Sequence, residues 1–413
     1  MSKDSKKPAI RFKGFTDDWE QRKCGDVMKE SRIPGHSGDV AKKITVKLWG
    51  KGVFKKDDIG SSNTQYFVRK EGQFIYSKLD FLNSAFGVIP KELDSYETTA
   101  DLPAFDCVCV NPYFMFYRAI QPNFYYENGI IADGSRKAKR IHADVFLNMP
   151  LKLPSIEEQN KITKFLLQLE NLITLHQRKL DKLKNIKKAL LEKMFPRNGE
   201  NIPEVRFKGF SDDWEQRKFD DVFNYLAHNS LSRDDLNDNE GSIKNIHYGD
   251  VLIKFGNVID TKHEYIPYVN DNVKLENKAC FLQDGDVVIA DAAEDSTVGK
   301  CTEISESSDQ KIVSGLHTIP CRPKNKFAKG FLGYYLNSNA YHDQLLPLMQ
   351  GTKVSSISKT SLKETTIKFP SSIEEQKKVG ACFHELDNLI TLHQRKLDKL
   401  KNIKKALLEK MFV

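Results

Sequence analysis

The sequence predicts an α+β protein in which two mixed α/β domains alternate with two long, antiparallel coiled-coil helices, a plan that is repeated once along the chain. Three observations lead to this prediction. The 25 residues at 171–195 recur unchanged at 388–412, and the 13 residues at 11–23 recur at 206–218 with a single difference. The stretches between these repeats barely resemble each other. One frame therefore surrounds two different inserts, as in a pseudo-twofold internal repeat.

The repeats set the expected domain boundaries. We expect a first mixed α/β domain over residues 1–154, a helix over 155–200, a second mixed domain over 201–371 and a second helix over 372–413. At 413 residues the chain is long enough for each mixed domain to have its own hydrophobic core.

Composition argues against a membrane protein and against a disulfide-rich one. Hydrophobic residues make up 39% of the chain, and no apolar run approaches the length of a membrane span. The first residues lack the apolar core of a signal peptide, so we expect a cytoplasmic protein. The seven cysteines contain no CxxC pair, which predicts reduced thiols and no zinc site.

The net charge of +8 resides on the repeated helices. Each copy of the 25-residue repeat has seven basic and two acidic residues, so the two copies together carry +10 and the rest of the chain carries −2. The inserts are therefore not generally basic. Any nucleic-acid contact that they make must depend on particular loops.

Residues 155–195 are predicted to form one long helix. Ser155 and Glu158 have the spacing of a capping box, as have Ser372 and Glu375 in the second copy. Apolar residues then recur at alternating intervals of four and three, which is typical of a coiled-coil seam. The seam positions are Ile162, Leu166, Leu169, Ile173, His176, Leu180 and Leu183, and in the second copy Val379, Phe383, Leu386, Ile390, His393, Leu397 and Leu400. Each helix should be roughly 60 Å long.

Each seam needs a partner, and the other helix carries the matching one. Antiparallel packing of the two helices would place the inserts at opposite ends. The apolar surface then widens, with Leu172 and Leu175 beside the seam and Ile186, Leu190 and Met194 beyond it. This wider surface would hold either a partner protein or the adjacent insert, and the sequence does not decide between them.

Both inserts contain an apolar strand after a glycine turn, at 72–78 and at 285–291. A second apolar segment at 105–110 is expected to be a buried strand that carries Cys107 and Cys109 on one face. Three apolar residues near the end of each insert are displaced by 216 positions: Ile141, Phe146 and Leu151 are mirrored by Ile357, Leu362 and Ile367. We therefore expect the inserts to share one fold with diverged surfaces.

One segment suggests catalysis. Asn111-Pro112-Tyr113-Phe114 follows a predicted strand and resembles the (Asn/Asp)-Pro-Pro-(Tyr/Phe) signature of amino-methyltransferases. Here Tyr113 replaces the second proline, and no glycine-rich cofactor loop lies upstream. We interpret the segment as a strand end, with a methyltransferase site as the alternative.

Other candidate sites are also incomplete. Gly299-Lys300 lacks the upstream glycine of a phosphate-binding loop. A cluster of acidic residues could suggest a metal or nuclease site: Asp284, Asp286, Asp291, Glu294 and Asp295. However, Asp284 and Asp286 are ordinary turn residues before a strand, and no lysine stands at the spacing found in nucleases. His176 and His393 are interpreted as polar seam contacts rather than ligands. The sequence thus predicts a chain without catalytic or metal-binding residues.

Two polar loops precede the mirrored apolar residues, at 134–140 (GSRKAKR) and at 351–356 (GTKVSS). Arg and Lys bind phosphates or guanine, and Ser, Thr and Asn bind bases or backbone. Together with a Gly/Lys-rich segment near residue 51 and the ends of the strands at 72–78 and 285–291, these loops provide our candidate DNA contacts. The candidates are Lys51, Lys55, Ser77, Lys78, Asn83, Arg136, Lys137, Lys139, Arg140, Asp291, Thr352, Lys353, Ser355 and Ser356.

Several motifs together resemble one family. WEQRK stands at 19–23 and 214–218, each time before an apolar residue, and Gly-Asp-Val-Val begins the strand at 285–288. Pro-Ser-(Ser)-Ile-Glu-Glu-Gln leads into each long helix, at 154–159 and 370–376. With the duplicated plan, these motifs resemble the DNA-specificity subunit of type I restriction–modification systems over essentially the whole chain.

The resemblance implies that each insert is a target recognition domain that reads one half of an asymmetric, bipartite site in double-stranded DNA. The helices would act as a spacer and would bind two methyltransferase (modification) subunits, and restriction/translocase subunits would complete the complex. This chain would be non-catalytic and would bind no cofactor. S-adenosylmethionine, ATP and Mg would be bound by the partner subunits. A stand-alone DNA-binding regulator is the alternative.

Overall fold

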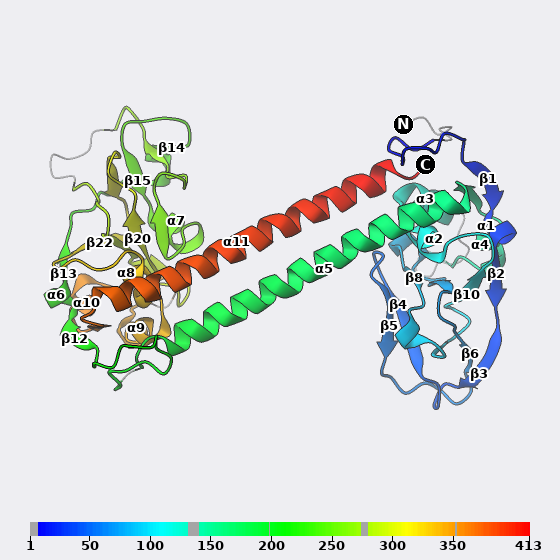
Figure 1. Ribbon diagram of the computed structural model, residues 1–413, viewed down its shortest axis with the longest axis horizontal. Helices are drawn as coiled ribbons and strands as arrows, with labels where there is room; N and C mark the ends of the chain where they lie inside the picture. Colours follow the sequence, from blue (N-terminus) through cyan, green and yellow to red (C-terminus); the bar gives the residue numbers. More distant parts are fainter. Residues whose placement is uncertain (1–6, 131–139, 198, 274–279, 352) are drawn as a thin grey trace. The chain divides into compact units, whose positions relative to one another are not determined.

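The computed structural model describes residues 7–130, 140–197, 199–273, 280–351 and 353–413 (Figure 1). The chain forms two compact units: unit 1 comprises Met1–Gln177 and Arg395–Val413, and unit 2 comprises Arg178–Gln394. The division falls inside both long helices, so each unit contains one insert and a part of each helix. No helix in the described residues is long and apolar enough to cross a membrane.

The two predicted long helices are present as α5 (Ile156–Lys193) and α11 (Ile373–Lys410), each of 38 residues (Figure 1). The Oγ atoms of Ser155 and Ser372 accept the N–H groups of Glu158 and Glu375, at 3.3 and 3.4 Å. These serines therefore cap the helices as predicted. The glutamates do not complete the capping box, because their carboxylates bind arginines elsewhere in the chain.

Every predicted seam position is buried or half-buried. Within unit 1, Lys404 of α11 forms an ion pair with Glu170 of α5 at 2.6 Å, and Met411 lies in the same hydrophobic cluster as Leu166 and Ile162. The helix segments in unit 1 therefore run antiparallel, because later residues of α11 meet earlier residues of α5.

The helix segments of unit 2 also run antiparallel. Lys187 pairs with Asp387 at 2.5 Å, and the rings of Phe195 and Phe383 stack at 5.7 Å. Moving from Lys187 in α5 to Phe195, just past its end, thus means moving backwards along α11 from Asp387 to Phe383. Each insert packs on segments of both long helices.

The insert of unit 1 contains a four-stranded sheet in the order β2-β10-β7-β8, a five-stranded sheet in the order β3-β6-β9-β4-β5 and the pair β1-β11. The strands are β1 (Glu20–Lys23), β2 (Met28–Ser31), β3 (Ile33–Ser37), β4 (Lys43–Lys47), β5 (Gly52–Lys56), β6 (Gln65–Val68), β7 (Phe74–Tyr76), β8 (Phe86–Val88), β9 (Glu97–Thr98), β10 (Ala104–Cys107) and β11 (Pro150–Leu153). The short helices are α1 (Cys24–Val27), η1 (Phe81–Asn83), η2 (Lys91–Leu93), α2 (Pro112–Ala119), α3 (Pro122–Gly129) and α4 (Ala143–Leu147).

The insert of unit 2 contains a five-stranded sheet in the order β13-β22-β18-β20-β16, a four-stranded sheet in the order β14-β17-β15-β21 and the pairs β12-β24 and β19-β23. The strands are β12 (Glu215–Lys218), β13 (Phe223–Tyr225), β14 (Leu236–Asn237), β15 (Lys244–Ile246), β16 (Val258–Asp260), β17 (Tyr268–Val269), β18 (Val287–Ala290), β19 (Ala292–Ala293), β20 (Cys301–Ser305), β21 (Ile312–Ser314), β22 (Thr318–Pro323), β23 (Ser355–Ser356) and β24 (Thr366–Phe369). The short helices are α6 (Phe219–Val222), η3 (Arg233–Asp235), α7 (Tyr248–Ile253), α8 (Phe331–Leu336), α9 (Asn339–His342), η4 (Leu346–Leu348) and α10 (Lys359–Lys363).

The two inserts share a strand order. The order β2-β10-β7-β8 in unit 1 corresponds, strand for strand, to β13-β22-β18-β20 in unit 2. The predicted strands at 72–78 and 285–291 are β7 and β18, and the mirrored apolar residues are all buried. One hydrogen bond is also repeated: Ile141 N–H donates to Lys78 O, and Ile357 N–H donates to Asp291 O. The predicted mixed α/β class with two long helices is confirmed.

The predicted strand at 105–110 is wrong in its second half. β10 ends at Cys107, and the N–H groups of Val108 and Cys109 both donate to the carbonyl of Val27. This contact bends the chain away from the sheet and toward α2. Cys109 is therefore exposed rather than on the inner face of a strand.

Candidate nucleic-acid interface

An ion pair joins the duplicated segments within each unit. The guanidinium of Arg11 donates to both carboxylate oxygens of Glu158, at 2.6 and 2.7 Å, and Arg206 donates to both oxygens of Glu375, at 2.7 and 2.9 Å. The glutamate side chains are 0% and 2% exposed. These charged hydrogen bonds raise the pKa of both arginines. The repeated sequences thus form one frame, built twice.

A glutamine next to each glutamate attaches the helix to its insert. The side-chain amides of Gln159 and Gln376 donate to the carbonyl of the proline before each helix, at 2.9 and 2.8 Å. Their Oε1 atoms accept backbone N–H groups of the inserts, from Asn111 at 2.9 Å and from Ala328 at 3.0 Å. Each insert is therefore held on its helix by equivalent contacts.

Candidate residues of unit 1 gather where β7 ends. Lys51 lies at the tip of the β4–β5 hairpin, and this tip is attached to η1 by two backbone hydrogen bonds. Trp49 N–H donates to Asn83 O and Gly50 N–H donates to Ser84 O, both at 2.8 Å. The hairpin tip and the candidate Asn83 therefore lie side by side, although 32 positions separate Lys51 from Asn83 in the sequence.

Lys78 and Arg140 are brought to the same place. Lys78 N–H donates to Asp101 O at 2.9 Å, and the Arg140 guanidinium lies 3.9 Å from the Asp101 carboxylate. Ile141, which follows Arg140, donates to Lys78 O. Lys51, Lys78, Asn83 and Arg140 thus surround the carboxyl end of one strand, and we name this the unit 1 loop cluster.

Two other candidates of unit 1 lie differently from the prediction. Lys55 is in β5 rather than in a loop, because the hairpin continues the pairing with β4. Its ammonium lies 5.4 Å from the ring centroid of Tyr96. Ser77 is 6% exposed, and its hydroxyl donates to Asp80 at 3.1 Å. The candidates outside the described residues are Arg136, Lys137, Lys139 and Thr352.

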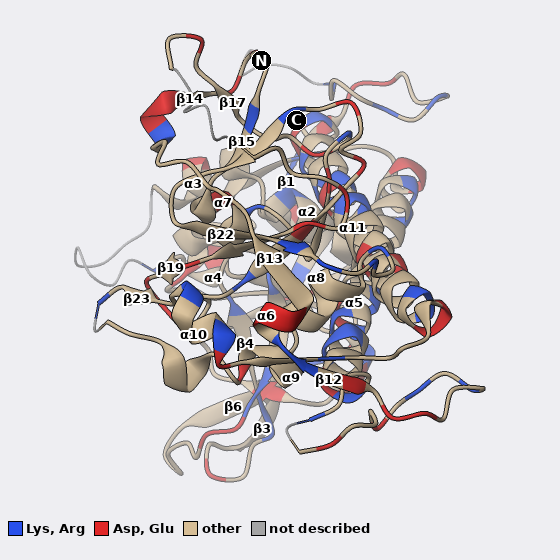
Figure 2. Cartoon of the chain, turned by 90° about the vertical axis from the view of Figure 1, so that its left-hand side faces the viewer, with Lys and Arg blue, Asp and Glu red and all other residues tan. Residues whose placement is uncertain are grey.

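The corresponding place in unit 2 is the end of β18. Asp291 follows this strand, and β19 begins directly after it. β19 pairs antiparallel with β23, which consists of Ser355 and Ser356. Lys353 is exposed just before β23, and Figure 2 shows basic residues beside β23 and α10. The structure therefore brings Asp291 next to the predicted loop at 351–356.

Sequence reasoning missed His317, which lies in the turn between β21 and β22. Its Nδ1 is 3.2 Å from Asp291 Oδ1, and Asp291 N–H donates to His317 O at 3.1 Å. Its backbone has a φ of 54°, which is unusual for a residue other than glycine. The signal in the sequence was Gly315, a turn residue between two apolar strands. We define Asp291, His317, Lys353, Ser355 and Ser356 as the unit 2 loop cluster.

Comparison with known proteins finds a similarity to one family. Residues 211–402 match the family model described as the type I restriction modification DNA specificity domain. This part of the chain is therefore similar to the type I specificity proteins. The chain is 25% identical over 277 residues to the specificity subunit of the type I restriction enzyme MjaVIII from Methanocaldococcus jannaschii, and the match covers 65% of this chain. It spans 62% of that relative, which is less than two thirds of its length.

One solved structure has a similar fold. The type I restriction–modification S subunit of M. genitalium has a TM-score of 0.51 at 12% identity, with 98% of this chain and 99% of that chain covered. The HsdS subunit of Thermoanaerobacter tengcongensis gives a TM-score of 0.47 at 17% identity, with 95% and 96% covered. At 12% identity, the similarity to the M. genitalium subunit concerns the fold alone.

Asn111-Pro112-Tyr113-Phe114 begins a helix. Asn111 is the N-cap of α2: its Oδ1 accepts the N–H groups of Tyr113 and Phe114, at 3.0 and 3.1 Å, and its Nδ2 donates to Asn160 at 2.8 Å. Phe114 is fully buried. The side-chain atoms of Asn111 thus cap α2 and bind the long helix α5. The predicted strand end is a helix start, because the chain bends after β10.

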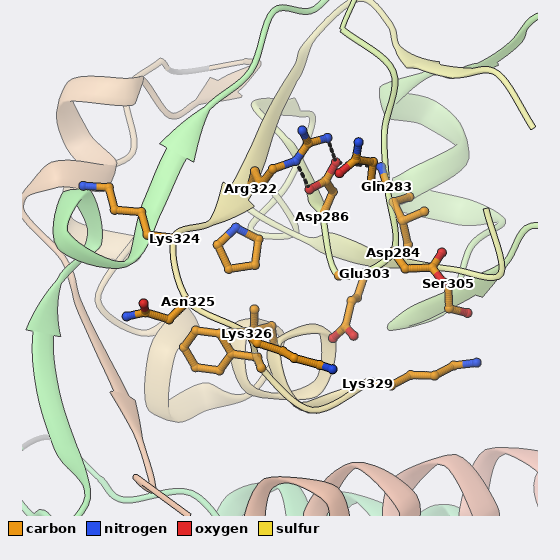
Figure 3. Close-up of a pocket in the computed structure, with 15 residues that line it drawn as sticks. Gln283, Asp284, Asp286, Glu303, Ser305, Arg322, Lys324, Asn325, Lys326 and Lys329 are labelled. Atoms are coloured by element: carbon orange, nitrogen blue, oxygen red, sulfur yellow. Dashed lines mark hydrogen bonds and ion pairs between the residues drawn. The ribbon is translucent and has the colours of Figure 1, made fainter. Parts of the chain in front are cut away.

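The acidic candidate residues of unit 2 do not gather at one point. Asp284 and Asp286 precede β18, whereas Asp291 follows it. Asp286 binds Arg322 through both oxygens, at 2.8 and 2.7 Å, beside a pocket of about 410 Å³ (Figure 3). Asp284 accepts the N–H and hydroxyl of Ser307. Among the described residues, no three His, Cys, Asp or Glu side chains are placed to hold a metal ion.

Glu303 borders the same pocket and is 2% exposed (Figure 3). Its carboxylate accepts the N–H groups of Gly330 and Gly333, at 2.6 and 2.9 Å, at the start of α8. Burial raises the pKa of Glu303 to about 7. The role of this carboxylate is to hold α8, since its oxygens are bound to backbone donors.

The raised pKa of Glu303 predicts a pH-dependent stability of unit 2. The folded state binds this proton more strongly than the unfolded state, so the stabilisation is complete below the ordinary glutamate pKa and is lost as the pH rises toward about 7. Glu303→Gln removes this titration. The difference in unfolding free energy between variant and wild type should therefore shift in favour of the variant between pH 5 and pH 8. Hydrogen exchange of unit 2 amides at several pH values, corrected for the intrinsic exchange rates, measures it. A constant difference contradicts the prediction.

Proposed function

We propose that this chain is the sequence-specific DNA-binding subunit of a type I restriction–modification complex, in which each insert is a target recognition domain for one half of an asymmetric, bipartite site. One observation supports this most directly. The same frame, built from Arg11–Glu158 and Arg206–Glu375, holds two inserts whose loop clusters occupy corresponding strand ends. To recognise two different half-sites, the two loop clusters must be placed equivalently but must carry different side chains.

The side chains in the two clusters suit different base contacts. Unit 1 offers Lys51, Lys78, Asn83 and Arg140, in which cations and an amide can bind phosphates, guanine or adenine. Unit 2 offers the carboxylate of Asp291, which can accept from cytosine, and the hydroxyls of β23. The proposed recognition domains are residues 1–154 and 201–371, and the proposed spacer helices are 155–200 and 372–413.

The helices support a spacer role. A helix of 38 residues is about 57 Å long. This length exceeds one turn of DNA, about 34 Å, so the two recognition domains can lie in separate major grooves with unread base pairs between them. In this proposal α5 and α11 form an antiparallel coiled coil under a pseudo-twofold axis.

The repeated helices also support binding of two methyltransferase subunits. Leu172 and Leu175 are 46% and 59% exposed, and their counterparts Leu389 and Leu392 are 41% and 44% exposed. By contrast, Met194 is buried in the core of unit 2, and Leu190 packs against that core. The wide apolar surface therefore has two parts. Leu190 and Met194 pack against the insert of unit 2, whereas Leu172 and Leu175 stay exposed and could bind a partner. Two copies of one surface favour two copies of one partner.

Catalysis then belongs to the partners. Methyltransferase subunits would use S-adenosylmethionine, and restriction/translocase subunits would use ATP and Mg. This chain would contribute the choice of DNA sequence and the assembly surface. A stand-alone DNA-binding regulator would not need exposed leucines at the same positions of both helices.

Methylation mapping tests the proposal. The chain is co-expressed with the type I methyltransferase subunit of its own genome, and methylated motifs are mapped genome-wide. Wild type should give one bipartite motif. Lys78→Ala should relax or weaken one half only, and Lys353→Ala the other half only, at about 1–3 kcal/mol for a base contact.

Lys326→Ala is the matched control, because Lys326 lines the pocket at the opposite end of β18 from Asp291. It should leave the motif unchanged. Failure of the methyltransferase to co-purify, together with tight specific binding by the chain alone, would favour the regulator. A motif that changes in both halves with one variant contradicts separate recognition domains.

A further inference from the structure

Trp49 is an exposed aromatic residue held in a strained backbone conformation at the tip of the β4–β5 hairpin. Its side chain is 62% exposed, whereas the other two tryptophans, Trp19 and Trp214, are 2% and 3% exposed. A large aromatic side chain that is exposed to water does not contribute the hydrophobic stabilisation that its burial would provide. The φ of Trp49 is 60°, a left-handed conformation that is strained for a residue other than glycine and persists only when the surrounding structure imposes it.

The surrounding structure imposes this conformation on Trp49. Its N–H donates to Asn83 O, and the N–H of Gly50 donates to Ser84 O, both at 2.8 Å. Gly50 has a φ of 63°, and a Cβ atom there would meet Ile120 Cγ2 at 3.0 Å. The hairpin tip is thus hydrogen-bonded to the η1 segment, and Gly50 packs closely against Ile120. The backbone of Trp49 is therefore held in place by hydrogen bonds, while its indole side chain is exposed to solvent.

Trp49 stands next in the chain to residues of the kind that bind nucleic acid. Lys51 is exposed and follows the tip, and the ammonium of Lys47 lies 4.0 Å from the ring centroid of Phe54, so it does not cover the indole. Within the described part of the chain, Trp49 makes no ring or cation contact. The same tip adjoins the unit 1 loop cluster. An exposed ring can stack on a base, and cations beside the ring can bind the phosphates on either side of that base.

We propose that Trp49 stacks on a DNA base of the half-site that unit 1 reads, while Lys51 binds an adjacent phosphate. The inference rests on the proposed function and adds a contact that recognises the base by its flat face rather than by its edge. Aromatic side chains stack on bases or wedge between base steps, and a fixed ring loses little conformational entropy when it does so. Trp49 would then favour base steps that unstack easily.

The test uses the chain assembled with its methyltransferase subunits and a fluorescein-labelled duplex that carries the mapped site. Trp19 and Trp214 are buried, and subtracting the signal of the Trp49→Phe complex removes the contribution of tryptophans in the partner subunits, so the difference reports on Trp49. Binding of the duplex should quench the tryptophan fluorescence and protect it from acrylamide. Trp49→Ala should bind about 5- to 150-fold more weakly, the range for one lost base stack. Trp49→Phe should restore most of the affinity, and Trp49→Leu should not.

Controls separate this inference from the proposed function. A scan with 2-aminopurine in the unit 1 half-site should find one position whose emission changes on binding and no longer changes in Trp49→Ala. Lys51→Ala should weaken all duplexes alike and lower the salt dependence. If the wild-type complex binds its site but Trp49 stays open to acrylamide and Trp49→Ala binds normally, the stacking inference is overturned and the function stands. If the wild-type complex shows no preference for the site, both are overturned.

Discussion

Replacing Phe412 with alanine should destabilise unit 1, the unit that contains the first insert, by about 3–5 kcal/mol. Phe412 is 4% exposed, and its ring centroid lies 5.3 Å from that of Phe114 and 6.3 Å from that of Trp19. Loss of this ring leaves a cavity in the core of unit 1. Figure 1 shows the first described residues beside the end of α11 in this unit, and Ile10 N–H donates to Lys410 O.

Phe195 occupies the same position of the repeat and should act on the other unit. Its ring contacts Tyr335 at 5.6 Å and Phe383 at 5.7 Å, both in unit 2. Phe195→Ala should therefore destabilise unit 2 by a similar amount. Identical residues of identical segments thus stabilise different inserts, because each helix ends against the insert that did not precede it.

Hydrogen exchange with mass spectrometry measures both effects, since it resolves the two units where a single unfolding curve would not. Phe412→Ala should lower protection of β7 and β10, and Phe195→Ala should lower protection of β18 and β22. Leu175→Ala, at an exposed position of the same repeat, should change protection by less than about 0.5 kcal/mol. Loss of protection in the β18 region from Phe412→Ala would contradict this assignment.

Replacing Glu375 with glutamine should destabilise unit 2 by about 3–5 kcal/mol, the cost of breaking a buried ion pair from one side. Arg206 loses its charged partner while its side chain remains 11% exposed. Trp214 Nε1 also donates to Glu375, at 3.3 Å, so a second buried donor is affected. The arginine cannot move into water without leaving the frame that holds the insert.

Glu158→Gln in unit 1 is the matched comparison. Trp19 corresponds to Trp214, and its Nε1 has no hydrogen-bond partner among the described residues. We therefore expect a smaller loss from Glu158→Gln than from Glu375→Gln. A double-mutant cycle with Arg206→Met, followed by hydrogen exchange, gives the pair's coupling energy. A loss below about 0.5 kcal/mol from Glu375→Gln would show that the pair is not part of the frame.

Features set by local pattern could be predicted from the sequence. The serine caps of α5 and α11, the buried seam and the mirrored apolar residues all follow from short-range periodicity and repetition. The strands β7 and β18 were found for the same reason. These features depend on residues a few positions apart, or on a comparison of the chain with itself.

Features set by distant contacts could not be predicted. Glu158 has the spacing of a capping box, yet Arg11, which lies 147 positions away, takes its carboxylate. Lys55 follows a glycine-rich turn, yet pairing with β4 makes it part of a strand. The exposed placement of Trp49 and the contact of His317 with Asp291 also depend on long-range hydrogen bonds.

The sequence by itself determined the duplicated frame, the two long helices and the presence of two unlike inserts, because repetition and apolar spacing can be read without coordinates. Only the tertiary structure decided which insert each helix end supports and which loop residues meet at one strand end. The physical reason is that a residue's neighbours in a folded core are chosen by packing and hydrogen bonding across the chain, and these leave no regular spacing in the sequence.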